Sequence, residues 1–492
     1  MARTLFGAPY DLESSVGSEL PEASELRLRP GVQFFPADDW TIAVDPTDGA
    51  WVALERSEHD ALRTRPDSLD PKLGRLMLET GLATVSGHAK ERLRPSRFVQ
   101  ELYFFELVVT TNCNLRCAYC FADAGAGAGS TITPSMARLF VDRVAEHRAR
   151  TRSIVPYVIE FTGGEPLAAF DAIRLTVEYA TDTYGDLLAV DFVVQSNLTR
   201  LTDEMVQWAA DHHVSIGASC DGFAAIHDAQ RPLASGSGSH RLVEESLRRL
   251  AGGHRRNGGS VIAVVTSKGV RHVPEILLHL ASLGAREVSM RPLVHAGRAT
   301  SATTVAPPDP REYVDGLFDA LEAVITPLHR DHGILVRERT LTTTFENLLS
   351  PHRTFMCERS PCGGARNICA VTPNGDVFPC NQSAGEAPWL LGNIQTRTFA
   401  ELMLTRPAAQ LASRTTAAID ECRDCAFRSW CGSPCPHSVY VKTGSIHSKS
   451  VECDLHRYRY QRAFQALLRG AVDLEVVSRL LHCERPIEWR RV

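Results

Sequence analysis

The chain has 492 residues, of which 44% are apolar and 23% charged, and its formal net charge is −5. This length is sufficient for two or three domains with separate cores, and the charge gives no electrostatic case for binding nucleic acid or a membrane surface. No apolar run is long enough for a signal peptide or a membrane span, so we expect a cytoplasmic protein without a nucleic-acid or membrane partner. Fourteen cysteines in a large chain of this kind indicate metal or redox chemistry rather than disulfides.

The first hundred residues predict a small α+β domain. Residues 32–46 and 51–54 are strand-like, with a turn at Thr47-Asp48-Gly49 between them, and two amphipathic segments follow at 57–65 and 69–80. Strands followed by helices form a winged-helix-like pattern, which we assign to residues 1–100.

Residues 101–310 alternate strands and helices. The expected strands are 105–110, 157–161, 190–195, 214–218, 260–266 and 287–293. The amphipathic stretches between them are 134–148, 169–183, 202–212, 241–256 and 273–283. Repeated βα units predict a parallel sheet, and functional groups on parallel barrels lie at the carboxyl ends of the strands.

Three cysteines follow the first of these strands. Cys113, Cys117 and Cys120 lie in the run Thr-Asn-Cys-Asn-Leu-Arg-Cys-Ala-Tyr-Cys-Phe. A cubane iron–sulfur cluster takes four cysteine thiolates, so a compact set of three leaves one iron open to a small molecule. The alternative is a zinc knot, which requires paired ligand motifs that are not completed around these residues.

The C-x3-C-x2-C spacing, with Tyr119 before the last cysteine, resembles the signature of the radical S-adenosylmethionine (SAM) enzymes. The resemblance implies an α/β fold with a partial (β/α)6 TIM-type barrel. It also implies that Cys113, Cys117 and Cys120 hold a catalytic cluster whose open iron chelates SAM and whose electron splits SAM to a 5′-deoxyadenosyl radical.

The ends of the next strands carry further matches to this family. Gly163-Gly164-Glu165-Pro166 follows the second strand, where the family contacts the SAM amino group, although these residues also suit a tight turn. Arg231, in a segment similar to the family's His-Asp-x-x-Arg, is the candidate for the SAM carboxylate, and an exposed arginine is the alternative. Polar residues in the regions that contact the ribose and amino-acid moieties are Ser196, Asn197, Ser219 and Asp221.

A second group of cysteines lies downstream. Cys422-x2-Cys425-x5-Cys431-x3-Cys435 and Cys453, with Gly375 and Cys380 upstream, resemble the twitch-and-SPASM extension of peptide-modifying radical SAM enzymes. That extension carries two auxiliary [4Fe–4S] clusters. The resemblance implies a first ligand set of Cys357, Cys362, Cys380 and Cys435 and a second of Cys422, Cys425, Cys431 and Cys453.

Two questions about these cysteines stay open at this point. Cys369 could replace Cys357 in the first set, and a pair of zinc-ribbon sites is the alternative to clusters. We place the auxiliary-cluster domain at residues 357–460, after a bridging region at 311–356, and expect a helical tail at 461–492.

The resemblance implies an enzyme with three [4Fe–4S] clusters and SAM that acts on a peptide side chain. Our first hypothesis is an intramolecular thioether or C–C cross-link in a ribosomally synthesised peptide, with an auxiliary cluster accepting the electron. The alternative is oxidation of Cys or Ser to formylglycine, as in anaerobic sulfatase maturases. Those enzymes place a basic aspartate after the glycine-linked cysteine, where this chain has Asn381, an amide that accepts no proton. Asp376 or Glu386 could substitute.

A different class of hypothesis is a non-catalytic metal-binding scaffold for a peptide, which would have a damaged SAM site. A small-molecule substrate is a third possibility. The expected partners are a precursor peptide with a leader segment and a flavodoxin or ferredoxin as electron donor. The N-terminal domain resembles the recognition element that binds leader peptides by β-augmentation, with a cap or dimerisation domain as the alternative.

Overall fold

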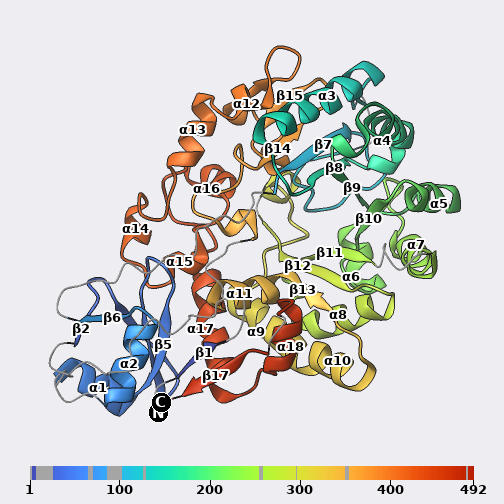
Figure 1. Cartoon of the computed structure of the whole chain (residues 1–492). Helices are drawn as coiled ribbons and strands as arrows, with labels where there is room; N and C mark the ends of the chain where they lie inside the picture. Colours follow the sequence, from blue (N-terminus) through green and yellow to red (C-terminus); the bar gives the residue numbers. More distant parts are fainter. Residues whose placement is uncertain are drawn as a thin grey trace.

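The computed structural model describes most of the chain (Figure 1). The described residues are 3–6, 26–64, 70–85, 102–125, 129–253, 259–294, 296–349, 354–483 and 486–491. Part of the predicted N-terminal domain, including residues 86–100, and the end of the expected segment 57–65 lie outside them.

A ten-stranded sheet in the order β13-β12-β11-β10-β9-β8-β7-β14-β15-β16 forms the centre of the molecule. Neighbouring strands from β13 to β14 are parallel. The six predicted strands are confirmed, as β7 (Phe104–Thr110), β8 (Tyr157–Gly163), β9 (Val190–Ser196), β10 (Val214–Ser219), β11 (Ser260–Val265) and β12 (Glu287–Pro292). The sheet is the expected partial barrel.

Helices follow the strands in chain order: α3 (Pro134–Thr151), α4 (Phe170–Tyr184), α5 (Asp203–Asp211), α6 (Ala224–Gln230), α7 (His240–Gly253) and α8 (Val273–Ser282). Thr133 and Thr202 begin α3 and α5, because their hydroxyls accept hydrogen bonds from the backbone of Met136 and Met205. Phe105 of β7 packs against Phe140 of α3, so alternation places Glu106 on the opposite, inner face of the barrel.

The bridging region is built mainly of helices. It contains α9 (Pro310–Ala320), a π-helical turn at Leu321–Ile325, α10 (Thr326–His332), β13 (Arg337–Glu338) and α11 (Arg339–Leu349). Strand β13 extends the barrel sheet beside β12.

The cysteine-rich region is joined to the barrel through its first strand. β14 (Ile368–Val371) pairs in parallel with β7, with Ala370 opposite Glu106, and then forms an antiparallel meander with β15 (Asp376–Phe378) and β16 (Gly392–Asn393). The helices that follow are α12 (Phe399–Leu402), α13 (Arg406–Ser413), α14 (Asp420–Arg423), α15 (Arg428–Cys431), α16 (Pro436–Thr443), α17 (Cys453–Arg469) and α18 (Leu474–Leu480).

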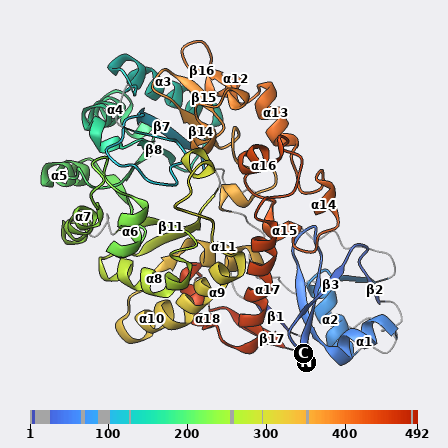
Figure 2. The ribbon, with the colours of Figure 1, turned by 180° about the vertical axis from the view of Figure 1, so that it is seen from behind.

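The N-terminal domain is a small β domain with two helices. Its elements are β1 (Arg3–Phe6), β2 (Leu26–Leu28), β3 (Gln33–Ala37), β4 (Trp40–Val44), β5 (Trp51–Glu55), α1 (Arg56–Thr64), α2 (Pro71–Glu79) and β6 (Ala83–Val85). One side has its own core, which includes Leu54, Leu62 and Leu76. On the other side, the ring of Phe35 packs against the ring of Phe427, with 4.7 Å between their centroids. This contact holds the domain against the cysteine-rich region, as Figure 2 also shows.

The two ends of the described chain meet in one sheet. β17 (Glu488–Arg491) pairs antiparallel with β1, and the sheet order is β17-β1-β5-β4-β3. The C-terminal segment expected to be helical therefore also contributes a strand, which a four-residue run at the end of a chain does not reveal by periodicity.

Candidate active site

The three cysteines of the first motif lie in the loop that follows β7. Burial raises the pKa of Cys117 to about 11; the Arg231 guanidinium opposes this shift, and the thiols of Cys120 and Cys113 add to it. The structure therefore brings the three thiols close enough to repel one another as thiolates. Such a set binds a cationic metal centre as it loses its protons.

The Gly-Gly-Glu-Pro segment packs directly on this loop. A Cβ on Gly163 would lie 2.2 Å from Thr110 O, and one on Gly164 would lie 2.1 Å from Asn112 O. Gly163 also has a φ of 131°, which favours glycine. Both residues therefore have to be glycine for the end of β8 to approach the cysteine loop.

Glu165 is fully buried and joins the ends of β8 and β9. Its carboxylate accepts hydrogen bonds from Ser196 Oγ at 2.7 Å, from Asn197 N at 2.8 Å and from Leu167 N at 2.9 Å. Burial raises the pKa of Glu165, and these hydrogen bonds lower it. Glu165 and Ser196 thus brace the strand ends of the predicted SAM site, and Pro166 begins the short 3₁₀ helix Pro166–Ala169 behind them.

Tyr119, Asp221 and Arg231 form a buried polar cluster. Tyr119 OH donates to Asp221 Oδ2 at 2.5 Å, and Arg231 Nη1 donates to Tyr119 OH at 2.8 Å while lying 3.6 Å from Asp221 Oδ1. Arg231 is 8% exposed, which removes the alternative of an exposed arginine. Its Nε is buried without a partner among the described residues, so this donor is available to a bound ligand.

The remaining predicted contacts lie at the same edge of the sheet. Asn197 Nδ2 donates to Asn114 Oδ1 at 3.1 Å, which joins the end of β9 to the cysteine loop. Ser219, at the end of β10, accepts a hydrogen bond from Gln195 Nε2 at 3.1 Å.

The sequence analysis did not select Arg298, which holds the cysteine loop through hydrogen bonds to its backbone. Arg298 Nη1 donates to Cys117 O at 2.7 Å, Nη2 donates to Ala124 O at 2.8 Å, and the backbone N donates to Cys120 O at 2.9 Å. A Cβ on the preceding Gly297 would lie 2.1 Å from Phe121 O. No spacing signal marks these residues, because they meet the motif only through the closure of the barrel.

The thiols of the first auxiliary set gather beside β7. Burial raises the pKa of Cys380 well above its usual value, and Glu106, Cys362, Cys435 and Cys357 raise it further. Burial likewise raises the pKa of Cys357 to about 12, with contributions from Cys362 and Cys435.

Cys369 lies apart from this group. It is fully buried within β14, and after burial the only charged group that raises its pKa among the described residues is Glu106. The structure therefore places Cys357, and not Cys369, with the other three thiols.

The thiols of the second auxiliary set gather at the start of α17. Burial raises the pKa of Cys422; a hydrogen bond from the Ser433 hydroxyl lowers it, and Cys425 and Cys453 raise it. Burial also raises the pKa of Cys431, to which Cys453 contributes. Within the parts of the chain that the structure describes, no three His, Cys, Asp or Glu side chains are placed to hold a single metal ion, and this applies to all three groups of cysteines.

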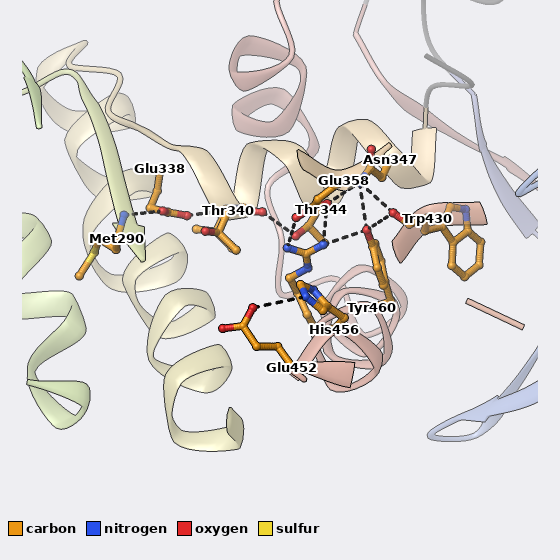
Figure 3. Close-up of polar contacts among 12 residues, drawn as sticks. Met290, Glu338, Thr340, Thr344, Asn347, Glu358, Trp430, Glu452, His456 and Tyr460 are labelled. Atoms are coloured by element: carbon orange, nitrogen blue, oxygen red, sulfur yellow. Dashed lines mark hydrogen bonds and ion pairs between the residues drawn. The ribbon is translucent and has the colours of Figure 1, made fainter. Parts of the chain in front are cut away.

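A buried polar network connects the two auxiliary sets (Figure 3). Arg459 of α17 makes two hydrogen bonds, of 2.8 and 2.9 Å, to Glu358, the residue after Cys357. Asn347 Nδ2 donates to Glu358 Oε2 at 2.8 Å and to Trp430 O, just before Cys431, at 3.1 Å. A Cβ on Gly432 would lie 2.1 Å from Glu358 O, so the backbones of the two sets are in direct contact.

The residue after Cys380 points into the barrel. Asn381 Nδ2 donates to Thr162 Oγ1 on β8 at 3.1 Å. The two alternative bases expected from the sequence have other partners. Asp376 accepts hydrogen bonds from Asn374 and Asn393. Glu386 Oε1 lies 2.8 Å from His437 Nε2.

Two carboxylates that the sequence analysis did not select lie on the inner face of the barrel. Glu106 of β7 is directly opposite Glu160 of β8 in the strand pairing. Burial and the neighbouring Glu160 raise the pKa of Glu106 to about 8, and burial raises the pKa of Glu160 to about 7. Two adjacent carboxyl groups with raised pKa values on one face of the sheet are suited to accept a proton near neutral pH.

The family models match both halves of this arrangement. Residues 107–289 match the radical SAM superfamily, and residues 362–426 match SPASM, an iron–sulfur cluster-binding domain. In the described residues, no helix combines the length and the apolar character needed to cross a membrane.

Relatives and solved structures extend the similarity beyond the two models. A cysteine-type anaerobic sulfatase-maturating enzyme of Clostridium perfringens is 22% identical over 375 residues, which cover 74% of this chain and 97% of that enzyme. The structure of native anSMEcpe with bound AdoMet has a TM-score of 0.62 at 20% identity and covers 75% of this chain and 99% of its own. The structure of Streptococcus suis SuiB bound to precursor peptide SuiA has a TM-score of 0.51 at 13% identity. The match covers 86% of this chain and 98% of SuiB. The chain thus joins a domain of the radical SAM superfamily to a C-terminal SPASM domain, and it is an enzyme.

Proposed function

We propose that the enzyme abstracts a hydrogen atom from a side chain of a ribosomally synthesised precursor peptide and forms an intramolecular thioether or C–C cross-link. We favour this reaction over formylglycine formation because of Asn381. This amide, which accepts no proton, stands where the sulfatase maturases have their basic aspartate. The likeness to SuiB, whose structure contains a precursor peptide, supports a peptide substrate.

We assign three [4Fe–4S] clusters to the three groups of cysteines. The cysteine loop would hold the SAM-binding cluster, and the eight downstream thiols divide into two sets of four, which is the full complement of a cubane. When bound and reduced, the first cluster and SAM supply a 5′-deoxyadenosyl radical. Arg231 Nε would bind the SAM carboxylate, while Glu165 and Asn197 hold the surrounding backbone in place.

The proposed reaction needs a proton acceptor as well as an electron acceptor. A C–H bond of the substrate loses its hydrogen atom, the partner group loses a proton, one electron is removed and a C–S or C–C bond forms. An auxiliary cluster held by the first set of thiols would supply the electron acceptor. We assign the proton to the Glu106–Glu160 pair, because Glu106 lies beside Asn381 and the Cys380 ligand on the inner face of the barrel.

The N-terminal domain is the proposed site for the leader segment of the precursor. The outer strands of its sheet are β17 and β3, and we assign the added strand to the β3 edge. Pro36 in β3 has no N–H, which reduces the hydrogen bonds that this edge can donate. A flavodoxin or ferredoxin remains the proposed electron donor.

Co-expression with short reading frames adjacent to the gene, followed by peptide mass spectrometry, tests this function. A cross-link removes one H₂ from the peptide and leaves no aldehyde. A hydrazide-reactive aldehyde on the peptide would instead establish formylglycine formation. Absence of 5′-deoxyadenosine after anaerobic reconstitution and reduction with SAM would favour the non-catalytic scaffold.

A further inference from the structure

Arg414 is a buried arginine without a carboxylate partner among the described residues. It follows α13 and is 3% exposed. Its Nη1 donates to Ser433 O at 2.6 Å, its Nη2 donates to Ser433 Oγ at 3.2 Å and to Ser448 O at 3.0 Å, and its Nε donates to Ile446 O. All of these acceptors are neutral.

A buried cation without a counter-charge destabilises a folded protein, because it loses its hydration. Arg459 avoids this cost because Glu358 neutralises it through two hydrogen bonds. Burial lowers the pKa of Arg414, and the groups that raise it, as thiolates, are cysteines of both auxiliary sets: Cys362, Cys422, Cys435 and Cys431.

The hydrogen bonds of Arg414 also position the loop at which the two sets meet. Residues 431–435 supply Cys431 to the second set and Cys435 to the first. Within this loop Ser433 and Cys435 have φ values of 51° and 53°, which are unfavourable for residues other than glycine. Ser433 is held by Arg414 on one side and by the backbone N of Ser450, at 3.1 Å from its Oγ, on the other.

We propose that Arg414 is a positioning residue that acts as the shared counter-charge of both auxiliary clusters and raises the reduction potential of each. The proposal rests on the ligand sets of the proposed function. A fixed cation stabilises the more negative, reduced state of a cluster, and charge and hydrogen bonding around the ligands set cluster potentials. A charge shared by two clusters keeps both able to accept an electron.

Arg414→Gln, Arg414→Lys and a control variant, Arg423→Gln, test this role. Arg423 follows Cys422 directly, but its side chain is 57% exposed and bonded to Asp420. Each variant is built in the Cys113/Cys117/Cys120→Ala background, so that only the auxiliary clusters contribute to the signal. The readouts are iron and sulfide content, midpoint potentials from a redox titration followed by electron paramagnetic resonance, and far-ultraviolet circular dichroism.

We expect about eight iron per chain in the background protein and in the Arg414→Lys variant, at four per cubane. In Arg414→Gln, the reduction equilibria of both clusters should shift at least tenfold toward the oxidised form, which is about 59 mV for a one-electron couple. Arg423→Gln should shift them less, because water and salt screen an exposed charge. If Arg414→Gln loses its clusters, the midpoint potentials of Arg414→Lys are used to test the role instead. Because lysine keeps the positive charge, we expect its reduction equilibria to stay within a tenfold shift of those of the background protein.

Unchanged potentials in Arg414→Gln, a shift of one cluster alone, or an equal shift in Arg414→Lys and Arg414→Gln would overturn the shared-charge role while leaving the ligand sets intact. A background protein without auxiliary iron would overturn both the role and the ligand sets. The formation of 5′-deoxyadenosine by the wild-type protein is measured separately, so a failure of the radical chemistry is distinguished from a failure of Arg414.

Discussion

The backbone N of Asn381 donates a hydrogen bond of 2.6 Å to Glu106 Oε2, although the two residues are 275 positions apart. This bond joins the residue after a proposed cluster ligand to the inner face of the first barrel strand. The proposed electron acceptor and proton acceptor are thereby placed side by side.

Glu106→Gln should separate hydrogen abstraction from cross-linking. Glutamine keeps the shape and accepts the hydrogen bond from Asn381 but takes up no proton, and a positioned general base contributes roughly a hundredfold or more to a rate. We expect 5′-deoxyadenosine to form while the ratio of cross-linked peptide to 5′-deoxyadenosine falls about a hundredfold. Glu178→Gln on the outer helix α4 is the control, and an unchanged ratio in Glu106→Gln would place the base elsewhere.

The same substitution should change how stability depends on pH. Burial raises the pKa of Glu106 in the folded protein from 4.5 to about 8, so its contribution to stability is complete below pH 4.5 and is lost as pH rises through about 8. We expect wild type and Glu106→Gln to have similar Tm values near pH 5, and the variant to become relatively more stable toward pH 8. The difference should be on the order of 1 kcal/mol per pH unit over this range. A difference that is independent of pH would contradict the raised pKa.

Gly164→Ala should damage the SAM site through backbone contact alone. The new Cβ would lie 2.1 Å from Asn112 O, and neither backbone can retreat without moving the cysteine loop or the end of β8. We expect a loss of 2 kcal/mol or more in stability, as for other strained core changes, together with weaker SAM binding in equilibrium dialysis. Gly252→Ala, which meets no atom within 4 Å on α7, is the control and should be neutral or slightly stabilising.

Iron analysis of two serine variants checks the choice between Cys357 and Cys369. Cys357 is grouped with three other thiols, whereas Cys369 is packed inside β14. We expect Cys369→Ser to keep about twelve iron per reconstituted chain and Cys357→Ser to fall toward about eight, at four per cubane. The reverse pattern would require a different first set.

The amino-acid sequence determined the features that are local in the chain. The alternation of apolar runs and amphipathic stretches predicted all six strands that begin the barrel, because parallel strands are buried on the face that packs against helices. The cysteine spacings predicted the two types of cluster region, because several ligands of each come from one short loop. The role of the two glycines before Glu165 was also predicted from the sequence, because it depends only on their spacing and on their position directly after a strand.

Tertiary structure decided the contacts between residues that are distant in the sequence. Glu106 is a single polar residue in an apolar strand, and only the register of β7 with β8 places it beside Glu160. Arg298 reaches the cysteine loop across 181 positions, and Arg414 reaches Ser433 across 19. Neither arginine belongs to a periodic pattern or a motif. The reason is physical: periodicity records which side of an element is buried, while the partner of a buried charge is set by chain closure, register and the packing of one domain on another.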